Sequence, residues 1–167
     1  MPRRGEFRVS VNKDYLVFAS AHFITFAGHR CEGLHGHNYR ASVTIEGRLN
    51  EEAWFVFDFV ELKRIMRKLC DEIDHLVLLP LQSDRVQVKE EDENVLVAVD
   101  GRPRYVFPRR DCALLPIPNT TVEMLAEMLI DRLRAALKEN GATGLTAIEM
   151  EVEENFGQSA TCRVTLD

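Results

Sequence analysis

The chain has 167 residues, of which 46% are hydrophobic and 29% charged, and its formal net charge is −6. This size and composition predict a single domain, residues 1–167, with a buried core. The negative charge disfavours a broad nucleic-acid surface, and no apolar run approaches the length of a membrane span. The start, MPRRGEFRVS, lacks the apolar segment of a secretory signal. Together with four scattered cysteines, this favours a cytoplasmic protein with free thiols.

The first third of the chain predicts two strands. Residues 6–23 alternate in character as one strand, and His22 lies on its inner face near the end. A loop with glycine breakers follows. Residues 35–47 then alternate again as a half-buried antiparallel strand, whose inner face begins with His35 and His37.

In the middle of the chain, the spacing of apolar residues changes from that of a strand to that of a helix. Residues 58–73 carry apolar side chains at helical spacing, and Asp58 is a suitable N-cap for this helix, which residues 74–80 end. Residues 83–108 predict an inserted β-hairpin that turns at Asp100-Gly101. The acidic run 89–93 is predicted to be a solvated loop.

A second helix and two final strands complete the predicted fold. An apolar stripe runs from Val122 to Leu137, and Asn140-Gly141 closes the helix. Residues 145–155 and 159–167 then alternate as two strands. The order predicts an α+β domain in which an antiparallel sheet carries two helices on one face.

Four of the five histidines lie between residues 22 and 37, which indicates a metal site. His35 and His37 point the same way because strand side chains alternate, and His22 on the preceding strand can join them. Three imidazoles with an open position suit a catalytic Zn²⁺ ion. His29, in the glycine-bounded loop, is a poorer ligand. If Cys31 is a fourth ligand, the site is closed and structural.

Six segments resemble the 6-pyruvoyl-tetrahydropterin synthase family, which includes the 6-carboxytetrahydropterin synthases of queuosine biosynthesis. The segments are FASAHF (18–23), CEGLHGHNY (31–39), FDFVELK (57–63), DHLVLLP (74–80), NTTVE (119–123) and EENFGQSA (153–160). The resemblance implies the tunnelling fold and a homo-trimer or homo-hexamer with active sites between subunits. It also implies a zinc-dependent lyase acting on 7,8-dihydroneopterin triphosphate, a pterin.

The resemblance also implies roles for individual residues. Those that match the zinc ligands are His22, His35 and His37. Those that match the catalytic groups are Cys31, the thiol, and Asp74 and His75, the pair that works with it. Those that match substrate contacts are Glu154, which anchors the pterin ring, Thr121 and Glu123. The segment from 82 to 115 is longer than in compact members of the family.

Several of these residues also have a structural interpretation. Cys31 alone is typical of an inert buried thiol, and Asp74-His75 can cap the C-terminus of the preceding helix. Thr120-x-x-Glu123 has the pattern of a capping box that opens the second helix. Glu154 can be an exposed strand end, although it shares the parity of the inward residues before it.

Glu32 gives the CEGLHGH segment a second possible acid–base group. In the family that the chain resembles, a divergent group associated with folate synthesis has glutamate at this position and makes 6-hydroxymethyl-dihydropterin. Glu32 is therefore either an alternative acid–base residue or a solvated loop residue. A pyruvoyl pterin, a carboxypterin and a hydroxymethyl pterin all remain possible products. A zinc-binding homologue without catalysis is the alternative of a different class.

Overall fold

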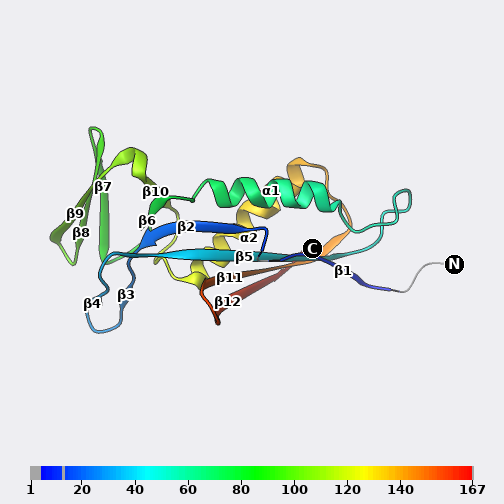
Figure 1. The fold of residues 1–167 in the computed structure, drawn as a ribbon, viewed down its shortest axis with the longest axis horizontal. Helices are drawn as coiled ribbons and strands as arrows, with labels where there is room; N and C mark the ends of the chain where they lie inside the picture. Colours follow the sequence, from blue (N-terminus) through cyan, green and yellow to red (C-terminus); the bar gives the residue numbers. More distant parts are fainter. Residues whose placement is uncertain (1–4, 13, 167) are drawn as a thin grey trace.

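The computed structural model describes residues 5–12 and 14–166 (Figure 1). Its elements in chain order are β1 (Phe7–Val11), β2 (Val17–His22), β3 (Thr25–Phe26), β4 (Arg30–Cys31), β5 (His35–Gly47), α1 (Phe59–Asp71), β6 (Leu76–Pro80), β7 (Val86–Glu91), β8 (Asn94–Val99), β9 (Arg102–Pro108), the 3₁₀ turn η1 (Arg109–Asp111), β10 (Cys112–Leu115), α2 (Val122–Glu139), β11 (Leu145–Asn155) and β12 (Gln158–Thr165).

Seven strands form one mixed sheet built around β5. Six strands follow the order β10-β6-β2-β5-β11-β12, and β1 pairs with the last residues of β5 on the same edge as β2. Strand β6 runs parallel to both β2 and β10, so the prediction of an antiparallel sheet is wrong in this region. Helix α1 returns the chain to the end of β2, and β6 then continues in the direction of β2. Side-chain alternation carries no information about strand direction.

Both helices pack on the same face of this sheet. The inward residues of the two central strands that meet the helices are Tyr39, Ala41, Val43, Ile45, Ile148, Met150 and Val152. The helix residues packed against them include Leu62, Met66, Leu125 and Leu129. Asp58 caps α1 as predicted, because its carboxylate accepts a hydrogen bond from the Val60 amide at 2.7 Å. The core therefore fixes the long strands whose ends carry the histidines.

Three strand assignments differ from the prediction. Residues 6–23 form two strands, β1 and β2, with a turn at residues 14–15; residue 13 lies outside the described residues. Residues 76–80, predicted only to end the helix, form β6 inside the sheet. A further strand, β10, pairs with β6 before α2 begins. Both β6 and β10 are short, and a period of two is hard to recognise over so few residues.

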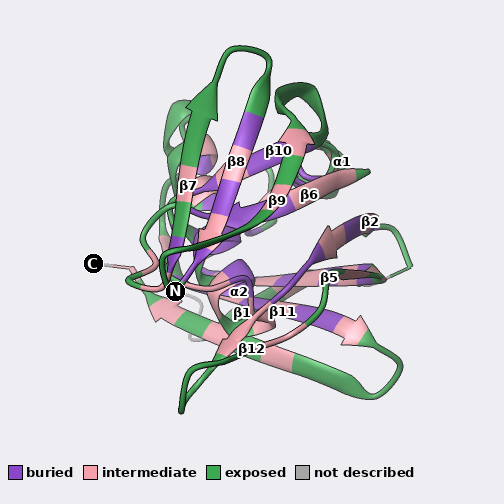
Figure 2. Ribbon diagram, turned by 90° about the vertical axis from the view of Figure 1, so that its left-hand side faces the viewer, coloured by how far each residue is buried: buried purple, intermediate pink, exposed green. Residues whose placement is uncertain are grey.

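The insertion between the helices is a three-stranded antiparallel sheet, β7-β8-β9, and not the predicted hairpin. The predicted turn at Asp100-Gly101 does join β8 to β9. The acidic run 89–93, predicted to be a loop, extends β7 to Glu91 before the chain turns at Asp92. Figure 2 shows that β7 is mostly exposed while β8 is buried at alternate positions, so the charged side chains lie on an outer strand.

A second apolar cluster holds this insertion against the rest of the domain. Its buried members are Phe23, Leu79, Val86, Val95, Val97, Val99 and Cys112, and Cys31 and Tyr105 pack beside them. The insertion is therefore attached next to the segment that carries Cys31. Within the described residues, neither helix is long and apolar enough to cross a membrane.

Candidate metal centre and active site

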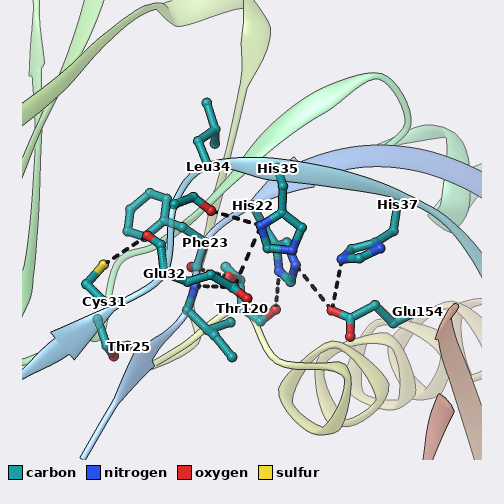
Figure 3. A network of polar contacts seen from close by, with 12 residues as sticks. His22, Phe23, Thr25, Cys31, Glu32, Leu34, His35, His37, Thr120 and Glu154 are labelled. Atoms are coloured by element: carbon teal, nitrogen blue, oxygen red, sulfur yellow. Dashed lines mark hydrogen bonds and ion pairs between the residues drawn. The ribbon is translucent and has the colours of Figure 1, made fainter. Parts of the chain in front are cut away.

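Three histidines converge at the ends of two paired strands (Figure 3). His22 lies directly opposite His35 in the register of β2 and β5, and His37 follows two positions along β5. One ring nitrogen from each lies within 4.8 Å of the other two. Gly36 between them faces the backbone of β2, where an added Cβ would approach the Ser20 carbonyl oxygen at 3.1 Å. The lack of a side chain there lets the two strands pair closely.

Backbone carbonyls orient two of the three rings. The Nδ1 atom of His22 lies 2.8 Å from the carbonyl oxygen of Thr120, and that of His35 lies 2.9 Å from the carbonyl oxygen of Gly33. When Nδ1–H donates to a carbonyl, Nε2 is left with a lone pair that can bind a metal. Metal-binding histidines generally have such a partner on the other nitrogen.

The residues present fit a metal ion. The Nε2 atoms of His22 and His37 are buried and form no hydrogen bond with any residue that the structure describes. Burial lowers the pKa of His22, although the Thr120 carbonyl and the Glu154 carboxylate oppose this effect. The Glu154 Oε1 atom lies 3.2 Å from Nε2 of His22 and 3.5 Å from Nε2 of His37. A neutral imidazole would direct its lone pair at a carboxylate oxygen, so a cation held by the imidazoles beside Glu154 would relieve this repulsion.

Glu154 comes from an irregular point of β11. The pairing of β11 with β12 shifts register between Glu153 and Asn155, so Glu154 is the extra residue of a bulge. Its side chain is partly exposed and points toward the histidines, as Figure 3 shows. Simple alternation predicts the same side of the sheet, and the structure places the carboxylate there at the position of the bulge.

Glu32 and Cys31 face different surroundings although they are neighbours in the chain. The Glu32 Oε2 atom accepts a hydrogen bond from the Ile24 amide at 3.4 Å and lies 3.7 Å from Nδ1 of His35. Cys31 lies on β4, and its thiol donates to the Glu32 carbonyl oxygen at 3.5 Å. It lines a hollow next to the insertion, with His29 and residues of β9. The Glu32 carboxylate therefore lies beside His35, while Cys31 lines the hollow next to the insertion.

The insertion holds this segment by its main chain. The Arg104 Nη2 atom donates to the carbonyl oxygen of Glu32 at 2.9 Å. The amide of Leu34 donates to the hydroxyl of Tyr105 at 3.2 Å. These two contacts are made to Glu32 and Leu34, so β9 positions the segment between Cys31 and His35. No local pattern in the sequence predicts these contacts, because they join residues more than 70 positions apart.

Asp74 and His75 lie just before β6 and form a pair. The Asp74 Oδ2 atom lies 2.8 Å from Nδ1 of His75, and its Oδ1 atom accepts from the Ala19 amide at 2.7 Å. Burial raises the pKa of Asp74, but the Ala19 amide and the His75 ring outweigh it and the pKa is lowered. Glu72 is the C-cap of α1, so this pair does not cap the helix. His75 is 82% exposed and lines a hollow with His37, separate from the hollow of Cys31.

Thr121 and Glu123 lie at the start of α2. Thr121 is its N-cap and accepts from the Met124 amide at 3.5 Å, so the predicted capping box with Thr120 is displaced by one residue. Thr120 is fully buried instead, and its hydroxyl donates to the Phe23 carbonyl oxygen at 2.9 Å. Glu123 is exposed. Among the described residues, no hydrogen bond or ion pair joins Thr121 or Glu123 to the three histidines.

The fold and the site together define an α+β domain with a three-histidine centre beside two carboxylates and a thiol. A family model described as 6-pyruvoyl tetrahydropterin synthase matches residues 11–165. The chain belongs to this family of enzymes, as the resemblance of its motifs implied.

Individual relatives support the same assignment. A protein of Methanocaldococcus jannaschii, provisionally named 6-carboxy-5,6,7,8-tetrahydropterin synthase, is 35% identical over 152 residues, which is 91% of this chain and 92% of the relative. The structure of 6-pyruvoyl tetrahydropterin synthase from Plasmodium falciparum is 30% identical, with a TM-score of 0.86 over 98% of this chain and all of the other.

Two further structures come from the Plasmodium vivax 6-pyruvoyltetrahydropterin synthase. In them a glutamate described as a catalytic residue is replaced by alanine or by cysteine. Both are 30% identical to this chain, cover 97% of it and 99% of the other chain, and have TM-scores of 0.83 and 0.82.

Proposed function

We propose that this protein is a zinc-dependent lyase that acts on 7,8-dihydroneopterin triphosphate and makes 6-carboxytetrahydropterin, as in queuosine biosynthesis. The observation that carries the proposal is the pair of buried Nε2 atoms of His22 and His37, which form no hydrogen bond among the described residues and face the Glu154 carboxylate. The name of the Methanocaldococcus relative supports the carboxypterin product over a pyruvoyl pterin.

The three histidines would hold the zinc ion through one nitrogen each. Bound zinc supplies Lewis-acid polarisation of a substrate oxygen at a position that the protein leaves open. The Thr120 and Gly33 carbonyls keep the rings of His22 and His35 oriented and set the tautomer of each. Because His22 is buried and its pKa is lowered, its ring stays neutral and able to bind a metal near pH 7.

Glu154 would bind the edge of the pterin ring. A carboxylate accepts two hydrogen bonds from a guanidine-like group, and charge-assisted bonds of this kind are strong and directional. The side chain is partly exposed next to the histidines, which supports this role. The ring would then lie with its carbon side chain over the histidine cluster.

Cys31, Asp74 and His75 would move protons on that side chain. A thiolate is a tunable base, and a histidine held by a carboxylate is a suitable proton shuttle. The Asp74–His75 contact at 2.8 Å gives the ring a fixed partner. Cys31 and His75 line separate hollows of one chain, so we propose that they meet across a subunit interface in a homo-trimer or homo-hexamer. Thr121 and Glu123 would contact the substrate from the start of α2.

A folate-type cleavage to 6-hydroxymethyl-dihydropterin is the second candidate. Glu32 lies 3.7 Å from His35 and is nearer to the histidines than Cys31, whose thiol faces the insertion. The catalytic glutamate of the Plasmodium vivax enzyme supports a chemical role for a carboxylate in this family. The Cys31 thiol and the Glu32 carboxylate occur in one segment of this chain. If each serves as a base, one site would make the two products in different amounts.

The test is to incubate the zinc-loaded protein with 7,8-dihydroneopterin triphosphate and to separate the products by chromatography. The proposal expects 6-carboxytetrahydropterin as the main product and little turnover after zinc is removed by a chelator. If substrate remains unchanged at high protein concentration with zinc present, the protein is a zinc-binding homologue without this chemistry.

A further inference from the structure

The hollow beside Cys31 carries an excess of positive charge. It has a volume of about 610 Å³, and Arg102 and Arg104 of β9 line it together with Asp100. The only carboxylate among its lining residues is already paired, because Arg85 donates to Asp100 through Nε at 2.9 Å and Nη2 at 2.7 Å. The charges that remain for a ligand are therefore those of the two arginines.

Arg102 is available for a ligand in a way that Arg104 is not. Both side chains belong to exposed residues. Arg104 donates through Nη2 to the Glu32 carbonyl oxygen and through Nε to the Tyr105 hydroxyl. Among residues 5–12 and 14–166, the side chain of Arg102 forms no hydrogen bond or ion pair, although its backbone pairs with Val99 in β8. The guanidinium donors of this exposed lining residue are thus not used by another described residue.

The hollow continues the line of the candidate active site. Figure 3 places Glu154 on one side of the histidines and Cys31 on the other. The contacts agree with this order: Glu154 lies against His22 and His37, and Glu32, next to Cys31, lies against His35. A molecule that is anchored at Glu154 and extends past the histidines therefore ends at the hollow that Cys31 lines.

We infer that this hollow, with Arg102 and Arg104, binds the phosphate chain of the substrate. The inference rests on the proposed function and deepens it, because it gives the inserted sheet β7-β8-β9 a role in substrate recognition. Guanidinium groups suit phosphate oxygens because their donors form a fixed planar fork. The chain as a whole has a net charge of −6, so a polyanion needs such a local group of cations to bind.

The test uses inorganic tripolyphosphate, which carries the phosphate chain without the pterin. Its affinity is measured by isothermal titration calorimetry for the wild type, Arg102→Ala, Arg102→Lys and a matched control, Arg134→Ala. Arg134 lies on α2 and is not a lining residue of this hollow. Its removal changes the net charge by the same amount as removal of Arg102. We expect affinity to fall about tenfold in Arg102→Ala, to recover in part in Arg102→Lys and to be unchanged in Arg134→Ala.

Kinetics then separate this inference from the proposed function. For Arg102→Ala, we expect KM for the triphosphate substrate to rise about tenfold with kcat little changed, while KM for unphosphorylated dihydroneopterin stays as in the wild type. Unchanged tripolyphosphate binding in Arg102→Ala, or an equal loss in Arg134→Ala, would overturn the phosphate site whatever the catalytic result. If Arg102→Ala loses tripolyphosphate binding but the wild type converts no pterin, the phosphate site is supported and the proposed reaction is contradicted.

Discussion

The ring of His22 and the main chain of Thr120 are joined by a hydrogen bond of 2.8 Å between Nδ1 and the carbonyl oxygen, although 98 positions separate them in the sequence. Thr120 is itself fixed, because its hydroxyl donates to the Phe23 carbonyl oxygen. The start of α2 thereby sets which nitrogen of His22 faces the other two histidines. A metal site of this kind depends on the packing of α2 as much as on its ligands.

Removal of one ligand is expected to release the metal. We predict about one zinc ion per chain in the wild type and almost none in His37→Ala, measured by mass spectrometry of the metal content. His29→Ala is the matched control, because the ring of His29 is 85% exposed and lies outside the three-histidine group. The circular dichroism of both variants should match the wild type. Full zinc content in His37→Ala would rule out this set of ligands.

The insertion is expected to hold the catalytic segment through Tyr105. Tyr105→Phe removes the hydroxyl that accepts from the Leu34 amide and from Arg104 Nε, and it keeps the ring that packs against Phe23. Each of these two exposed hydrogen bonds is worth about 1 kcal/mol, so the free energy of unfolding should fall by about 2 kcal/mol at most and the protein should stay folded. We expect faster hydrogen exchange at residues 31–35 and a lower kcat, measured by mass spectrometry and steady-state kinetics.

Tyr15→Phe is the control for that effect. The hydroxyl of Tyr15 forms no hydrogen bond among the described residues, and its ring is 61% exposed. This variant should exchange and turn over like the wild type. Equal exchange at residues 31–35 in Tyr105→Phe and in the wild type would show that β9 does not hold the segment.

Cys31 and Glu32 are expected to control different products. We predict that Cys31→Ala lowers carboxypterin formation at least about a hundredfold, as removal of a general base does. Glu32→Ala should leave most of it but remove any hydroxymethylpterin made from dihydroneopterin substrates. Cys162→Ala on β12 is the control. Full activity of Cys31→Ala on the triphosphate would refute the thiol assignment, and unchanged products in Glu32→Ala would end the folate-type interpretation.

Two inactive variants are expected to restore activity when they assemble together. If Cys31 of one subunit works with His75 of the partner, co-expressed Cys31→Ala and His75→Ala chains form some intact sites, about a quarter in a random ring. Purified mixed assemblies should recover activity in that proportion. Co-expression of Cys31→Ala with the double variant Cys31→Ala/His75→Ala should recover none. No recovery in the first mixture would place the whole site within one chain.

Periodicity and caps predicted much of the fold. The alternation of β5, the apolar stripes of both helices and the cap at Asp58 are local properties, and the structure confirms them. The parallel pairing of β6 with β2 and β10 was missed, because it depends on which strands meet after a helix. The charges in β7 suggested a loop, since an outer strand exposes side chains that a loop also exposes.

The same distinction between local patterns and contacts of distant segments applies to the site. His22, His35 and His37 were predicted to lie together because strand alternation and pairing determine their relative positions. Thr120, Arg104 and Tyr105 had no local signal, because each acts across a long sequence separation. The roles of Cys31, Asp74, His75, Glu154, Thr121 and Glu123 come from the resemblance and stay predictions.

Zinc-edge X-ray absorption spectroscopy of the purified protein tests whether three histidines hold one zinc ion with an open position. We expect nitrogen neighbours at about 2.0 Å, with any further ligand being an oxygen. A sulfur neighbour at about 2.3 Å would place the Cys31 thiolate on the metal and make the site closed and structural. That result would contradict the catalytic interpretation of both the zinc and the thiol.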